Sequence, residues 1–251
     1  MRVKIKGDPG GKGGNAPGGG SGTWRRLYLV RHGEVAYFGP DGRPADPWEV
    51  SLNANGKAQA GRLATALSAC GAELLMTSAV PRAIQTAAIL AAGMNLTPVV
   101  DACWNELRPG DLAAVPPERL HGVIVDAYRR AAEPGACFFG GEGFSDFARR
   151  AGDALEHLLA ARSWSTAVVV THDPVLRFIV ARCLGLGLGG MRFFEHEPGC
   201  INVIEFENSA DGAGGSLIRL MNGAPGDLAR LAGRGPVLDR FYQRYTAAQR
   251  A

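Results

Sequence analysis

The chain has 251 residues, a length that suits one globular domain with short extensions. Hydrophobic residues make up 46% of the sequence and the formal net charge is +3, so the composition supports a full core and argues against a broad nucleic-acid surface. The five cysteines are scattered and odd in number, which indicates a reducing compartment rather than a disulfide scaffold. No apolar stretch approaches the roughly 20 residues that a membrane span needs, and no secretory signal begins the chain, so we expect a cytoplasmic protein with neither a membrane nor a nucleic-acid partner.

The first residues differ in composition from the rest of the chain. Residues 7–22 are mostly glycine, interspersed with proline, asparagine and serine. Such a stretch cannot bury enough apolar area to offset the entropy lost on ordering. We therefore predict a flexible tail over residues 1–23 and a single domain over residues 24–251.

Apolar periodicity and turn residues predict alternating strands and helices after this tail. The predicted strands cover residues 27–30, 73–77, 98–101 and 166–170, and residues 201–206 and 217–221 suggest a hairpin. The predicted helices cover residues 53–70, 78–92, 116–131, 145–162, 173–184 and 238–249, with Asn53, Ser78 and Asp173 as expected caps. Repeated strand–loop–helix units are typical of a three-layer α/β/α sandwich around a mostly parallel sheet.

Chemically useful residues follow several of these strands. Arg31 and His32 come directly after the first strand, Ser78 leads from the second to Arg82, and His172 follows the strand at 166–170. Ligands bind beyond the carboxyl ends of such strands, so we expect these side chains to meet at one edge of the sheet. A neutral histidine can attack a phosphoryl group, and arginine forks match phosphate oxygens. This edge is therefore suited to phosphoryl transfer, with His32 as the candidate nucleophile.

The segment Arg31-His32-Gly33-Glu34 resembles the Arg-His-Gly signature of the histidine phosphatase superfamily, the phosphoglycerate mutase-like proteins. Further segments resemble those of the family in the same order and extend the resemblance over about residues 26–222: Ser78–Ala87, Asn105–Arg108, Gly140–Glu142, Val170–Arg177 and Arg219–Asn222. A three-residue match is weak, but an ordered set at sensible spacing is specific.

The resemblance implies a phosphatase that hydrolyses a small phosphorylated substrate, a phosphomonoester, through a phosphohistidine on His32. It implies that Arg31, Arg82 and His172 form the phosphate pocket. It also implies that Glu106 donates a proton to the leaving group and then activates water, with no metal and no cofactor.

Two departures from the family pattern bear on these roles. Residues 35–38 lack the asparagine that mutases carry after the Arg-His-Gly, and residues 109–113 replace the run that usually follows the acid. Both departures weaken the interpretation as a phosphoglycerate mutase, and both loosen the assignment of Glu106. Asp173 is the runner-up donor, because the acid-phosphatase branch of the family takes its acid from that position. A mutase and a non-catalytic module that binds a phosphorylated ligand stay as alternatives.

The sequence assigns no firm role to several further acidic residues and to residues 195–197. Glu142 is a weak pocket candidate, Glu34 faces either the pocket or solvent, and residues 195–197 are predicted to form a solvated loop rather than a metal site. We expect residues 35–50 and 107–142 to set substrate specificity, with Trp48, Trp104 and Phe138 or Phe139 as candidate lining residues. The sequence leaves open whether the chain forms a homodimer.

Overall fold

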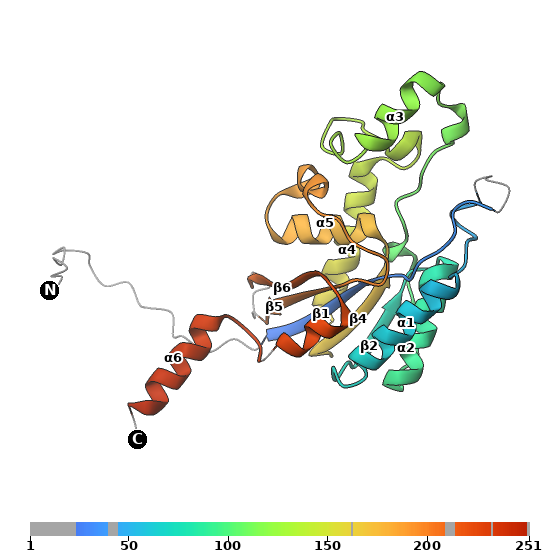
Figure 1. Ribbon diagram of the computed structural model, residues 1–251. Coiled ribbons are helices and arrows are strands. Elements are labelled where there is room, and N and C mark those ends of the chain that lie inside the picture. The colour runs from blue at the N-terminus through green and yellow to red at the C-terminus, as the bar shows by residue number, and fades with distance from the viewer. Residues whose placement is uncertain (1–23, 40–44, 162, 209–213, 232, 250–251) are drawn as a thin grey trace, which may run out of the picture.

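The computed structural model describes residues 24–39, 45–161, 163–208, 214–231 and 233–249, so the predicted tail lies outside the described residues. Its centre is a six-stranded sheet with the strand order β3-β2-β4-β1-β5-β6 (Figure 1). β3, β2, β4 and β1 are parallel to one another, β5 runs antiparallel to β1, and β6 runs antiparallel to β5. The strands are β1 (Trp24–Arg31), β2 (Leu74–Thr77), β3 (Val99–Val100), β4 (Thr166–Thr171), β5 (Ile201–Glu207) and β6 (Ser216–Gly223).

Helices cover both faces of this sheet, which confirms the predicted three-layer sandwich (Figure 1). α1 and α2 pack on one face, and α4 and α5 pack on the other. The helices are α1 (Ala54–Leu67), α2 (Pro81–Met94), α3 (Pro117–Val125), α4 (Phe144–Ala160), α5 (Asp173–Cys183) and α6 (Val237–Ala248).

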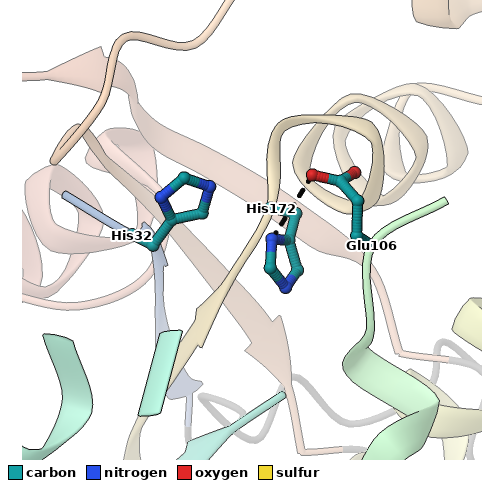
Figure 2. A group of neighbouring side chains, drawn as sticks. All are labelled: His32, Glu106 and His172. Atoms are coloured by element: carbon teal, nitrogen blue, oxygen red, sulfur yellow. Dashed lines mark ion pairs between the residues drawn. The ribbon is translucent and has the colours of Figure 1, made fainter. Parts of the chain in front are cut away.

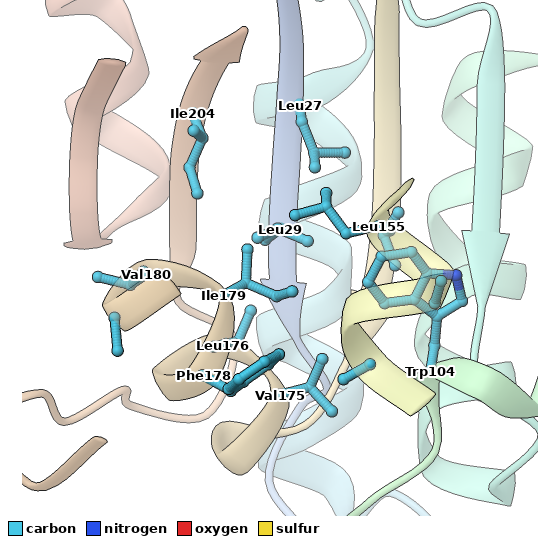
Figure 3. Close-up of a cluster of buried hydrophobic side chains, with 14 of the residues drawn as sticks. Leu27, Leu29, Trp104, Leu155, Val175, Leu176, Phe178, Ile179, Val180 and Ile204 are labelled. Carbon is cyan, nitrogen blue, oxygen red and sulfur yellow. The ribbon is translucent and has the colours of Figure 1, made fainter. Parts of the chain in front are cut away.

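The alternation of side chains along β1 divides the core between these two faces. Leu27 and Leu29 pack against α4 and α5, as Figure 3 shows around Leu155 and Ile179. Tyr28 and Val30 point to the opposite face, toward α1 and α2. β1 is therefore covered on both sides, and this packing holds in place its carboxyl end, where Arg31 and His32 lie.

Two sequence predictions about helix boundaries are wrong. The helix predicted over residues 116–131 ends at Val125, and α3 has no buried residue, so tertiary packing does not support a longer helix. Ser78 does not cap α2: the N-cap is Val80, which makes no side-chain capping bond, and Pro81 fixes the first helical position. Asn53 does cap α1, through a hydrogen bond from the Gly56 N–H.

Asp173 is the first residue of α5 rather than its cap, and His172 occupies the cap position. α5 is among the most buried helices, with Val175, Leu176 and Ile179 fully covered (Figure 3). No single helix in the described ranges is long and apolar enough to cross a membrane, and only α5 together with the 3-10 segment Gly187–Phe193 passes that test of length and composition, across a bend of 119°.

Candidate active site

His32 lies just beyond β1, and neighbouring segments hold its backbone on both sides. Its N–H donates to the Thr171 carbonyl at 3.0 Å, and its own carbonyl accepts from the Gly199 N–H at 3.1 Å. The ring is buried, with Nδ1 at 2.7 Å from the Gly33 carbonyl and Nε2 at 3.1 Å from Arg82 Nε. A carbonyl only accepts, so the hydrogen-bond network assigns the proton to Nδ1 and leaves a lone pair on Nε2.

The surroundings of His32 keep this ring neutral. Burial lowers its pKa well below the usual value for histidine, and His172, Arg82 and Arg31 lower the pKa further. The bond to the Gly33 carbonyl opposes this shift only weakly. An imidazole that stays neutral and presents an unprotonated Nε2 has the properties of a nucleophile.

The loop after His32 packs directly onto the first turn of α1. A Cβ added to Gly33 would come within 2.4 Å of the Gly56 carbonyl oxygen, so only glycine fits there. The Gly33 N–H donates to Thr86 Oγ1 at 3.1 Å. Glu34 accepts from the side-chain amides of Asn53 and Asn55, both at 2.7 Å, and these bonds lower its pKa. Glu34 therefore binds the start of α1, which settles a point that the sequence left open.

Arg82 connects three parts of the site from the first turn of α2. Its guanidinium is buried, and Nε donates to His32. Its other nitrogens donate to Glu106 Oε2 at 3.3 Å and to the carbonyl of Pro47. Arg31 donates to the His196 carbonyl, but its Nε is buried without a hydrogen-bond partner among the described residues. Both arginines thus place positive charge beside the His32 ring.

His172 and Glu106 lie next to each other and across from His32, as Figure 2 shows. The two histidine rings are 5.1 Å apart between centroids. His172 is fully buried, with Nδ1 at 3.4 Å from Glu106 Oε2 and Nε2 at 2.7 Å from Ser78 Oγ. Burial lowers the pKa of His172, and the Glu106 carboxylate offsets this only in part. Burial raises the pKa of Glu106, but His172 and Arg82 together bring that pKa below the usual value for glutamate.

Asp173, the runner-up proton donor, has a carboxylate that is fully engaged by other groups. Oδ2 accepts from Arg177 Nε at 2.7 Å and from the Tyr128 hydroxyl at 3.4 Å, while Oδ1 lies 3.3 Å from His196 Nδ1. Burial raises the pKa of Asp173, but these partners outweigh it and hold the pKa below the usual range. His196 is buried, so the prediction that residues 195–197 form a solvated loop is wrong for its central residue.

A pocket of about 550 Å³ opens beside Glu106. Trp48 lines it, with the Arg108 guanidinium 5.1 Å from the centre of its ring. Glu142 also lines it, and Arg150 donates to that carboxylate at 2.9 Å. The pocket therefore adjoins Glu106, the residue that the sequence predicts as the proton donor.

The other predicted lining residues lie elsewhere. Trp104 is fully buried in the core and does not line the pocket, so that prediction is wrong. Its carbonyl instead accepts from Thr171 Oγ1 at 2.7 Å. Phe138 and Phe139 stack on each other with ring centroids 3.9 Å apart, and Phe138 also stacks on Tyr128.

One nitrogen of each of His32 and His172 and one oxygen of Glu106 lie within 4.8 Å of one another. Two imidazoles and a carboxylate are ligands that zinc accepts. However, Arg82 already donates to His32 Nε2 and to Glu106 Oε2, so a cation occupies this position and would repel a metal ion. The arrangement is suited to an anion, such as a phosphoryl group.

The structure brings together all five site residues predicted from the sequence. Sequence reasoning missed the contacts of Ser78, Thr86, Tyr128 and His196. For Thr86 a signal was present, because a residue four positions after Arg82 lies on the same face of the helix. The contacts of the other three depend on pairings between distant segments.

Comparisons with known proteins agree with this geometry. The family model of the histidine phosphatase superfamily (branch 1) matches residues 27–213. The adenosylcobalamin/alpha-ribazole phosphatase of Escherichia coli is 28% identical over 182 residues, which are 72% of this chain and 89% of that protein. Phosphoserine phosphatase 1 of Hydrogenobacter thermophilus is 29% identical over 185 residues, which are 72% of this chain and 87% of that protein.

A crystal structure of the alpha-ribazole phosphatase of Shigella flexneri superposes with a TM-score of 0.64 at 25% identity, over 84% of this chain and all of that one. The family match covers well over half of the sequence and includes the segments that carry His32, Arg82, Glu106 and His172. The chain belongs to the histidine phosphatase superfamily.

Proposed function

We propose that this protein is a phosphatase that hydrolyses a small phosphomonoester through a phosphohistidine on His32. The observation that carries the proposal is the setting of the buried His32 ring: Nδ1 lies 2.7 Å from the Gly33 carbonyl, which leaves Nε2 unprotonated, and Nε2 accepts from the Arg82 guanidinium that would also bind the phosphate. The curated relatives support it, since both compared above are phosphatases of small phosphorylated compounds.

In the first step, the phosphate oxygens accept hydrogen bonds from Arg31, Arg82 and His172. His32 Nε2 attacks phosphorus, the bond from phosphorus to the ester oxygen breaks, and that oxygen takes a proton from Glu106. Glu106 must therefore be protonated when substrate is bound. A bound phosphate dianion favours this, because its charge opposes that of the carboxylate and offsets the pull of Arg82.

In the second step, the Glu106 carboxylate takes a proton from water as the water oxygen attacks phosphorus. The bond between phosphorus and Nε2 breaks, and His32 is neutral again. The positive groups around the transferring phosphoryl stabilise its charge throughout, which is the main source of rate in this class of reaction. Specificity is proposed to reside in the pocket beside Glu106, which receives the leaving group.

Replacing His32 by alanine tests the proposal. The variant should release no phosphate from p-nitrophenyl phosphate and should form no phosphohistidine that can be trapped by rapid denaturation and detected by mass spectrometry. His157→Ala is a matched control, because His157 is exposed on α4 away from the site. Full activity in His32→Ala would show that the mechanism is wrong.

The same assay separates hydrolysis from the mutase alternative. A mutase would return the phosphoryl group to another hydroxyl, so adding alcohol acceptors would lower the yield of free phosphate.

The single domain over residues 24–251, the cytoplasmic location and a homodimer stay predictions.

A further inference from the structure

Ser78 is a buried hydroxyl in the site for which the proposed reaction has no direct use. The sequence predicted it as a helix cap, but it lies two residues before the N-cap of α2 and is fully buried. Its Oγ is 2.7 Å from His172 Nε2, the ring nitrogen on the side away from Glu106. The hydroxyl is thus directed at a histidine whose proton position decides what that histidine can do.

The hydrogen bonds around Ser78 fix the direction of this contact. Ser78 Oγ accepts the Val80 N–H at 3.4 Å, and within the described residues His172 Nε2 is the acceptor in reach of its own hydrogen. If Nε2 carried a proton, the Ser78 hydrogen would be buried without an acceptor, which is unfavourable. The hydroxyl therefore donates, and Nε2 accepts.

The other ring nitrogen gives the same answer independently. His172 Nδ1 lies 3.4 Å from the Glu106 carboxylate. Without a proton on Nδ1, two lone pairs would face each other there; with one, the contact is attractive. This contact is not a well-aligned hydrogen bond, and Nδ1 is otherwise buried without a partner in the ranges that the structure describes, so a ligand oxygen can still accept its N–H.

We infer that Ser78 is a positioning residue: its hydroxyl holds His172 in the tautomer with hydrogen on Nδ1, so that this N–H points at the transferring phosphoryl group. The inference rests on the proposed function for the identity of the ligand, but the tautomer itself does not depend on it. Ser78 would act through His172 and not on the substrate.

Nitrogen-15 NMR of the histidine rings tests the tautomer directly in the unmodified protein. We expect His172, assigned through a His172→Gln variant, to show a protonated Nδ1 and an unprotonated Nε2 at neutral pH. A protonated Nε2 would overturn the inference, whatever the variants do.

Kinetics test the consequence. Ser78→Ala should lower kcat by about 10- to 100-fold, as is typical when a group that orients a functional histidine is removed, with a smaller change in KM. Its NMR spectrum should show part of His172 with hydrogen on Nε2. Ser78→Thr keeps the hydroxyl and should recover most of kcat. Thr77→Val is the matched control, since it removes a fully buried hydroxyl that donates to the Ser78 carbonyl and not to His172.

Failure of this inference can be told apart from failure of the proposed function. If Ser78→Ala keeps both the wild-type kcat and the wild-type tautomer while His32 is still phosphorylated, only the role of Ser78 is wrong. If no phosphohistidine forms but His172 shows the expected tautomer that changes in Ser78→Ala, the proposed function is wrong and the Ser78 contact stands. If Ser78→Ala loses kcat and Thr77→Val loses as much, the effect is structural and the positioning role is overturned.

Discussion

Glu106 and Asp173 can be distinguished as proton donors by a matched pair of substitutions. Glu106→Gln removes the acidic proton but keeps the size of the side chain, and Asp173→Asn does the same at the rival position. Glu106 Oε2 lies 3.3 Å from Arg82 and 3.4 Å from His172 Nδ1, so it faces the phosphate pocket. The Asp173 carboxylate instead accepts a hydrogen bond from Arg177 Nε at 2.7 Å and also contacts His196 Nδ1. We expect only the Glu106 change to affect proton transfer.

The size of the effect follows from the chemistry of proton donation. General acid catalysis contributes about 10²- to 10⁴-fold in rate, or about 2.7–5.4 kcal/mol of the barrier. Glu106→Gln should lose that much kcat with glycerol phosphate, whose alkoxide leaves poorly. With p-nitrophenyl phosphate, whose phenolate leaves without help, the loss should stay below about 10-fold.

Asp173→Asn should mainly affect stability. It removes the charge that holds Arg177, and a hydrogen bond between charged groups contributes about 1.5–3 kcal/mol. We expect the free energy of unfolding in urea to fall by about 2 kcal/mol, while kcat stays within a few-fold of wild type for both phosphate esters. If Asp173→Asn loses more rate than Glu106→Gln with glycerol phosphate, the assignment of Glu106 is refuted.

Three further predictions concern the frame and charge of the site. Gly56→Ala places a Cβ 2.1 Å from the Glu34 carbonyl oxygen, so it should lower the free energy of unfolding in urea by about 1–3 kcal/mol and remove most of the activity. In the control Gly61→Ala the new Cβ has no atom within 4 Å, so the free energy of unfolding should stay the same or rise. The folded state lowers the pKa of His32, whereas in the unfolded chain this histidine takes up a proton below about pH 6.5. The contribution of His32 to the free energy of unfolding is therefore fully present above that pH and is lost as the pH falls toward the lowered pKa. Unfolding measured over a pH series should show this loss of stability, and the loss should be smaller in His32→Gln. Inorganic phosphate should raise Tm, by an amount corresponding to about 2.7 kcal/mol at 100 times its Kd, and Arg82→Gln should abolish the shift; an unchanged shift in that variant would place the anion elsewhere.

The parts of the fold that depend on local sequence could be predicted from it. The β-branched run predicted over residues 166–170 is β4, the Asn53 cap occurs where expected, and Pro81 lies in the first turn of α2 as expected, although Ser78 is not its cap. α3 was predicted too long, because its amphipathic pattern is real but no core lies beneath it. Periodicity reports which face could be buried and does not report whether another element covers it.

The site was predictable to the extent that its residues follow strands. The carboxyl ends of β1 and β4 and the start of α2 bring His32, His172 and Arg82 to one edge by topology. Trp104 and His196 were placed wrongly, because Trp104 ends a single-turn 3-10 helix and His196 lies in a loop, and in such short segments distant contacts set the direction of the side chain. Ser78 was read as a cap from its position before a helix, and its bond to a histidine 94 residues away could not be seen in the sequence.

The two backbone hydrogen bonds of His32 have a consequence for how this protein can change over time. Its N–H is bound to the end of β4 and its carbonyl to the segment before β5, so the residue proposed as the nucleophile is held by its backbone at the edge of the sheet. The walls of the pocket come from elsewhere, with Trp48, Arg108 and Glu142 in three separate loops. Under the proposed roles, substitutions in these loops would exchange one leaving group for another without shifting the attacking nitrogen. Reaction chemistry and substrate choice would then be physically separable in this fold, so that selection or protein engineering could alter the second while the first stays intact.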